Sequence, residues 1–150
     1  MMIVAMILAA LLHRLREREL FWVLAWPGTV LHEVCHLTVG FVLGAQPMKF
    51  SVFPQPREAG GRTHGYVEFG NIAWFNAAPV ALAPLLGLGL AFVLSSQLTW
   101  QLTWSNLLLW WVCVSTFCQS WPSRQDWRVA VQSPVGLALY AGAVLGFVML

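Results

Sequence analysis

The segment Leu31-His32-Glu33-Val34-Cys35-His36-Leu37 lies inside a run from Leu20 to Ala45 that is otherwise almost entirely apolar. On a helix, His32 and His36 are one turn apart and share a face, so their two imidazoles can bind one zinc ion. Glu33 is then placed to take a proton from a water molecule at the metal. An ionisable group costs about 2.5–3.5 kcal/mol at the centre of a bilayer. We therefore predict that this group faces a protein interior or a wet cavity, where it has partners.

Two other interpretations of the same residues stay open at this point. The pattern is also compatible with a buried helix whose histidines donate hydrogen bonds to backbone carbonyls and bind nothing. It is equally compatible with a structural zinc site that performs no chemistry. An intact glutamate beside the first histidine favours catalysis, because a structural site needs no base there.

The composition indicates a membrane protein. The chain has 150 residues, of which 59% are hydrophobic and only 9% charged, whereas a soluble domain carries about 25% charged residues. We predict one domain over residues 1–150, integral to a membrane. The net charge of +2 gives no argument for nucleic acid as a partner. Three cysteines without a CxxC pair give no disulfide framework.

The apolar runs predict an all-α polytopic membrane protein with about four to five transmembrane helices. Whether the first run spans is left open, because twelve helical residues rise only about 18 Å against a hydrocarbon core of about 30 Å. The predicted spans are Met1–Leu12, Leu20–Gly44, Ile72–Leu94, Asn106–Ser120 and Val129–Leu150.

The residues from about 46 to 71 form the one extended polar segment. Apolar and polar residues alternate over 49–53 and again over 63–69, and Gly60-Gly61 between them is typical of a turn. This pattern predicts a short β-hairpin at the membrane surface. His64, in its second strand, is interpreted as a surface histidine rather than a metal ligand.

A catalytic zinc site needs a third protein ligand. Asp126, which lies between two apolar runs, is favoured over Cys35, because three donors within one helical turn would crowd each other. Asp126 also stands three residues after Ser123, a spacing typical of a helix-capping pair, so a purely structural role is the alternative.

These residues resemble the site-2 protease family of intramembrane zinc metalloproteases. The resemblance covers roughly residues 20–130. Within the family, the chain is similar to the small bacterial and archaeal members that lack a PDZ domain. It rests on the His-Glu-x-x-His motif in an apolar helix and on Asp126 after Pro122-Ser123. Gly65-Tyr66-Val67-Glu68 and the stretch from Ala78-Pro79 to Ala83-Pro84-Leu85-Leu86 add to it. The family's Asn-x-x-Pro and Leu-Asp-Gly element is absent as such, since Asn76-Ala77-Ala78-Pro79 precedes the aspartate by a whole predicted span.

The resemblance implies regulated intramembrane proteolysis in a bacterial or archaeal cell membrane, with a transmembrane protein or peptide as substrate. His32, His36 and Asp126 would bind zinc and Glu33 would be the general base. We expect an extended substrate to pair with the strand Tyr66–Phe69, so that Tyr66, Val67 and Glu68 contact it. Asn76 would stabilise the oxyanion or, alternatively, satisfy the carbonyls of a broken helix. The competing function is a non-catalytic zinc-binding membrane adaptor or chaperone that retains the protease scaffold.

Overall fold

The computed structural model describes residues 1–56 and 62–148. Its longest helix is α2 (Glu19–Val42), and two pairs of short strands follow it. The predicted Gly60-Gly61 turn lies outside the described residues. The remaining elements are α1 (Met2–Arg14), β1 (Pro47–Ser51), β2 (Gln55–Pro56), β3 (Arg62–Thr63), β4 (Tyr66–Phe69), α3 (Ala77–Leu82), the 3-10 helix η1 (Ala83–Leu85), α4 (Leu86–Ser96), α5 (Trp104–Gln119), α6 (Arg124–Val131) and α7 (Pro134–Val148).

The prediction of four to five transmembrane helices is wrong. Within the described residues, one helical segment, Ala77–Ser96, is long and apolar enough to cross a bilayer. Core helices of soluble proteins can have the same length and composition. The other apolar runs form shorter helices of 13, 16 and 15 residues in α1, α5 and α7, which rise only about 20–24 Å. The run predicted from Val129 is divided, because α6 ends at Val131 before α7 begins at Pro134. The 24-residue α2 is long enough, but its histidines, glutamate and Pro27 reduce its hydropathy.

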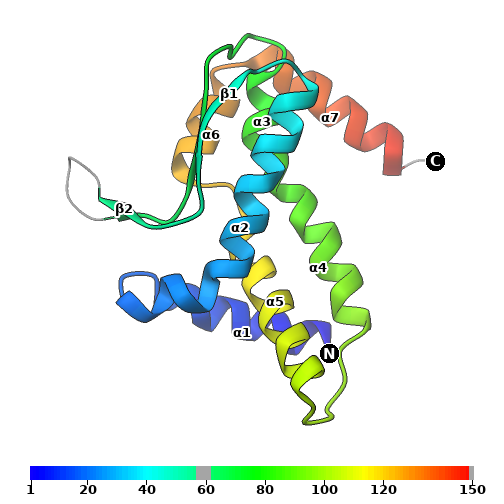
Figure 1. Ribbon diagram of the computed structural model, residues 1–150. Coiled ribbons are helices and arrows are strands. Elements are labelled where there is room, and N and C mark those ends of the chain that lie inside the picture. The colour runs from blue at the N-terminus through cyan, green and yellow to red at the C-terminus, as the bar shows by residue number, and fades with distance from the viewer. Residues whose placement is uncertain (57–61, 149–150) are drawn as a thin grey trace.

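Helix α2 runs through the centre of the molecule (Figure 1). Its first turns pack with α1 and α5 around a cluster of small and apolar side chains that includes Phe21, Ala25 and Cys118. At Gly28, α5 approaches so closely that a β-carbon there would overlap the backbone carbonyl of Ser115. The glycine therefore sets the distance between α2 and the carboxyl-terminal half of α5.

We expect Gly28→Ala to destabilise the protein by at least about 2 kcal/mol, because the added methyl group meets backbone rather than a movable side chain. Gly89→Ala is the matched control: Gly89 also lies inside a helix, and a β-carbon there has nothing within 4 Å. That control should be neutral or slightly stabilising, since alanine favours the helix by about 0.5–1 kcal/mol. Chemical denaturation of both variants measures the difference, and equal midpoints would refute this account of Gly28.

The segment from 46 to 71 contains antiparallel strands, as its alternation predicts. β1 pairs with β4, from Pro47 opposite Phe69 to Ser51 opposite Tyr66, and β2 pairs with β3. The hairpin lies against α2 (Figure 1), where a β-carbon at Gly40 would overlap the Phe69 ring. This packing brings β4 alongside the helix that carries the His-Glu-x-x-His motif.

Candidate metal centre

His32, His36 and Asp126 converge on one point although Asp126 lies 90 residues further along the chain. One ligand atom from each lies within 4.8 Å of the others. Asp126 Oδ2 is 3.6 Å from His32 Nε2, and Asp126 Oδ1 is 3.5 Å from His36 Nε2. All three side chains are largely buried. This group can hold a metal ion.

Two backbone carbonyls orient the imidazoles. His32 Nδ1 lies 2.6 Å from the carbonyl oxygen of Gln119 at the end of α5, and His36 Nδ1 lies 2.7 Å from that of Val80 in α3. A carbonyl oxygen only accepts, so in each ring Nδ1 must carry the proton and donate it. In the neutral imidazole, Nε2 is then the unprotonated nitrogen, with its lone pair directed at the shared point.

The two Nε2 atoms face each other at 3.1 Å. With both Nδ1 atoms protonated, two neutral rings would bring two lone pairs together beside a carboxylate, an arrangement that lacks any donor. A proton on one ring, or a metal cation at the centre, removes this repulsion. Around tetrahedral zinc, with bonds of about 2.0–2.1 Å, neighbouring ligand atoms are about 3.3 Å apart. The separation of 3.1 Å between the two Nε2 atoms is close to that value, and the shortest contacts to Asp126, 3.5 and 3.6 Å, are made by its two different oxygens.

Asp126 also completes a capping box at the start of α6. Its Oδ2 accepts a hydrogen bond from the backbone N–H of Ser123 at 2.6 Å, and its own N–H donates to Ser123 Oγ at 3.2 Å. The two roles proposed from sequence are therefore held by one carboxylate. The cap stabilises the helix end and also fixes the direction in which the carboxylate faces the histidines.

Burial and charge shift the two acids of the site in opposite directions. Burial raises the pKa of Glu33 to about 7, the charge of His32 opposes that rise, and the charge of Asp126 adds to it. Burial also acts to raise the pKa of Asp126, but in the metal-free site the His32 and His36 rings, when protonated at Nε2, and the hydrogen bond from the Ser123 N–H outweigh it and hold that pKa well below its usual range.

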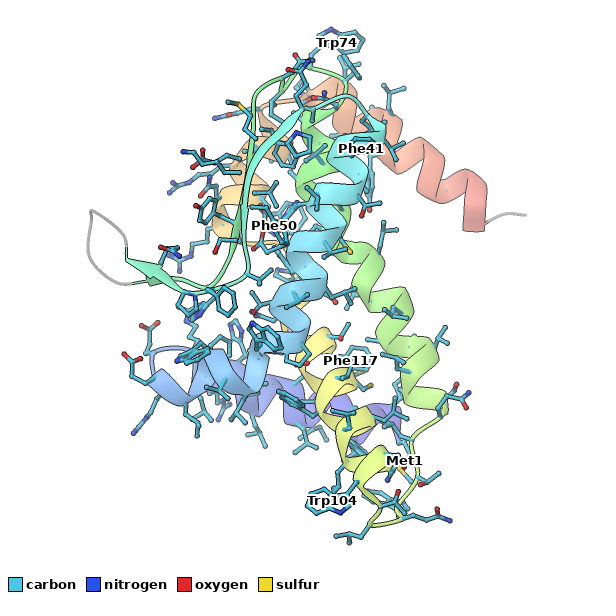
Figure 2. All side chains as sticks on the ribbon, viewed as in Figure 1. Met1, Phe41, Phe50, Trp74, Trp104 and Phe117 are labelled. Carbon is cyan, nitrogen blue, oxygen red and sulfur yellow. The ribbon has the colours of Figure 1, made fainter. Side chains whose placement is uncertain are left out.

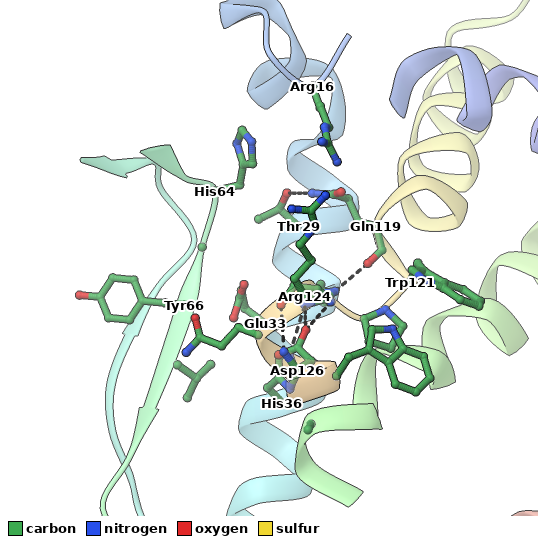
Figure 3. Close-up of a pocket in the computed structure, with 18 of the residues that line it drawn as sticks. Arg16, Thr29, Glu33, His36, His64, Tyr66, Gln119, Trp121, Arg124 and Asp126 are labelled. Atoms are coloured by element: carbon green, nitrogen blue, oxygen red, sulfur yellow. Dashed lines mark hydrogen bonds and ion pairs between the residues drawn. The ribbon is translucent and has the colours of Figure 1, made fainter. Parts of the chain in front are cut away.

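The three candidate metal ligands and Glu33 line a cavity of about 1470 Å³. Figure 3 shows Glu33 beside His36 and Asp126, with Tyr66 and His64 on the hairpin side of the cavity. Val67, Glu68 and Phe69 also line it. The structure thus brings the predicted substrate-contacting residues Tyr66, Val67 and Glu68 to the same cavity as the motif. The cavity exceeds the roughly 300–1,000 Å³ of a small-molecule pocket, which suits a larger ligand.

Gly65 is the residue of the hairpin that passes directly over Glu33. A β-carbon at Gly65 would lie 2.8 Å from Glu33 Oε1 and 2.7 Å from its Cγ. Any larger residue would push the carboxylate aside or toward the histidines. The missing side chain therefore leaves Glu33 its position next to the metal group.

Two residues considered from sequence are not part of this group. Asn76 is fully buried, and its amide is occupied elsewhere: it accepts from the Ala73 N–H at 2.7 Å and donates to the carbonyl oxygens of Asn71 and Leu43. These carbonyls belong to the end of α2 and to the loop before α3, not to the broken helix that the alternative to an oxyanion role named. Cys35 is half-buried and is not among the converging donors.

His64 lies in the cavity wall, with its ring edge-on to Phe21 at a centroid distance of 5.1 Å. It therefore does not lie on an outer surface, as its polar loop suggested. It is also absent from the converging donors of the described residues.

Sequence reasoning missed the groups that hold the ligands in place. The orienting atoms of Gln119 and Val80 belong to the backbone, so no side-chain pattern identifies them. The Gln119 side chain donates to Thr29 Oγ1 at 2.7 Å, which ties the end of α5 to α2 one turn before His32.

Comparison with known proteins identifies no relative: no protein-family model, curated protein or solved structure matches this chain.

Proposed function

We propose that this protein is a zinc-dependent endopeptidase that hydrolyses peptide bonds in or near membrane segments of other proteins. The observation that carries the proposal is the facing pair of Nε2 atoms and a carboxylate, with Glu33 beside them in a large cavity. A metal group alone would serve a structural role as well. Glu33 is a buried carboxylate next to this metal group, and among the described residues it neither caps a helix nor pairs with an arginine. Such a free carboxylate supports catalysis.

Two nitrogens and one carboxylate are the ligand set of many catalytic zinc sites, which keep a fourth position for water or substrate. When bound, zinc would polarise the scissile carbonyl and ease removal of a proton from water. His32, His36 and Asp126 would hold it. The Gln119 and Val80 carbonyls would keep the two rings in the tautomer that binds metal.

Glu33 is the proposed general base. Glu33 lies three residues before His36 on α2, and only 7% of its surface is exposed. A carboxylate in this position takes a proton from the attacking water and returns it to the leaving amine. Gly65 above it leaves room for that carboxylate beside a substrate backbone.

The substrate would bind as an extended strand along β4. β4 pairs with β1 on one edge only, and β4 rather than β1 lines the cavity. The N–H and C=O groups on the other edge are therefore available to a peptide that adds to the sheet. An extended backbone also exposes the scissile bond, which a helical substrate would shield.

We also propose that the protein works at a lipid bilayer, with Ala77–Ser96 as its spanning segment. Many large apolar side chains face outward, among them Phe41 at 75% and Phe92 at 58% exposure, and a surface of this kind favours lipid over water. Exposed Trp74 and Trp104 lie at opposite ends of the molecule (Figure 2), as tryptophans at two membrane interfaces do.

This membrane assignment predicts that the protein stays with lipid vesicles during flotation and resists extraction by alkaline carbonate. A single spanning helix buried in lipid withstands the removal of charge contacts, whereas a surface-bound protein does not. Release into the soluble fraction under carbonate would exclude a spanning segment.

The peptidase proposal predicts about one zinc per chain in the purified protein and cleavage of apolar peptides that stops on chelation. Restoring zinc should restore cleavage, because metal-supplied polarisation cannot be replaced by the remaining side chains. Metal analysis together with mass spectrometry of the products measures both. A fully zinc-loaded protein that cleaves no peptide or membrane protein would instead favour the adaptor function.

A further inference from the structure

The cavity contains an arginine that the proposed reaction does not use. Arg124 is the first residue of α6, two positions before the ligand Asp126, and its side chain lines the same cavity. Figure 3 shows it extending from α6 past the metal group toward the Thr29–Gln119 pair, with Arg16 pointing toward it from the α1–α2 connection. Two guanidinium groups from different elements thus line the cavity.

Apart from Glu33, the proposed base, the carboxylates that line the cavity already have partners. Glu17 bonds to Arg16 at 3.2 Å, Glu68 bonds to Lys49 at 3.0 Å, and Asp126 faces the histidines. Glu19 is engaged as well. Among the described residues, Arg124 forms no ion pair with any of these acids. Arg124 is therefore an exposed guanidinium at the cavity without an ion pair among the described residues, and the one acid of the cavity left unpaired there is the proposed base Glu33.

From this arrangement we propose that Arg124 makes the site selective for peptides that carry a carboxylate close to the scissile bond, with Arg16 as a second contact. The inference rests on the proposed peptidase function, and it names the substrate class of that site. An extended peptide advances about 3.4 Å per residue. A substrate side chain one or two positions from the bond that is cut therefore lies within about 7 Å of it, a distance that a long side chain such as Arg124, in the wall of the same cavity, can bridge. A planar guanidinium binds a carboxylate through two parallel hydrogen bonds, which a neutral amide cannot match.

Binding is measured on the zinc-loaded Glu33→Gln protein, which retains the metal ligands and is not expected to turn peptides over. The probes are blocked, fluorescently labelled apolar nonapeptides that carry Glu or its isostere Gln at one position at a time. We expect the best Glu peptide to bind about tenfold more tightly than its Gln counterpart, the range of a charge-assisted hydrogen bond. Adding Arg124→Gln should reduce this preference to less than about twofold.

Arg14→Gln is the matched control. It removes the same charge from the neighbouring helix α1, but Arg14 does not line this cavity. The Glu preference should persist in that variant. Arg124→Glu gives a gain that a damaged fold cannot imitate: the preference should move to peptides with Lys at the same position. Equal binding of Glu and Gln peptides, or a Glu preference that survives Arg124→Gln, would overturn the assignment.

Cleavage by the parent protein separates this inference from the proposed function. If the parent cleaves Glu and Gln peptides equally and Arg124→Gln changes nothing, the selectivity fails while the peptidase stands. If no peptide is cleaved but Glu peptides bind in an Arg124-dependent way, the peptidase fails and the carboxylate site stands.

Discussion

Glu33→Gln is expected to abolish peptide hydrolysis while the protein keeps its zinc. The amide has nearly the shape of the carboxylate but cannot accept a proton, so the general base is lost and the rate should fall by about 10²–10⁴-fold. Metal binding should persist, because Glu33 is not among the three converging ligands. The variant should also stay folded, because a neutral amide costs less to bury than a carboxylate and this position is only 7% exposed.

The measurement pairs product formation with zinc content for the parent and the variant. Glu17→Gln is the control, since it removes the same charge from the wall of the same cavity but lies outside the proposed metal and substrate contacts and leaves Glu33 in place. We expect it to retain most of the activity. Cleavage by Glu33→Gln at the parental rate would show that another group is the base.

Asp126→Ala is expected to weaken zinc binding by at least about 100-fold, and Cys35→Ala is expected to leave it nearly unchanged. Changes to groups that merely support a ligand already cost about 10–100-fold in affinity, so loss of a ligand should cost more. Asp126 faces both histidines at 3.5–3.6 Å, whereas Cys35 lies outside the converging group. Competition with a zinc chelator gives the affinities.

Ser123→Ala provides an intermediate case in the same series. It leaves the Asp126 carboxylate in place but removes the hydroxyl that accepts from the Asp126 N–H. Loss of a helix cap costs about 1 kcal/mol, and zinc affinity should fall by about tenfold because the carboxylate is less firmly directed. A larger loss in Cys35→Ala than in Asp126→Ala would transfer the third ligand to the cysteine.

The local part of the site was predictable from sequence because helix geometry fixes it. Residues four apart lie on one face of any α-helix, so His32 and His36 had to share a side wherever the helix packed. The capping pair of Ser123 and Asp126 is local in the same sense, and it occurs as predicted. The strands between 46 and 71 followed from alternation, which also depends only on neighbours.

The number of membrane spans was not predictable in the same way. Composition indicates how much of the chain avoids water, but helix length depends on where the chain turns. α6 and α7 divide one apolar run, and α5 is only 16 residues long. Asn76 illustrates the same limit, since its polar side chain near the motif helix bonds only to backbone groups, the Ala73 N–H and the carbonyls of Leu43 and Asn71.

The sequence by itself determined the pair of histidines, the adjacent candidate base and the cap that carries the candidate third ligand, because each depends on spacings within one helical turn. Only the tertiary structure decided that Asp126 meets the pair, that Gln119 and Val80 orient the rings, and that Arg124 lines the same cavity. Those relations join segments 44–94 residues apart in the chain. They depend on close backbone packing such as that of Gly28 against Ser115, and packing of distant surfaces is not written in the spacing of neighbouring residues.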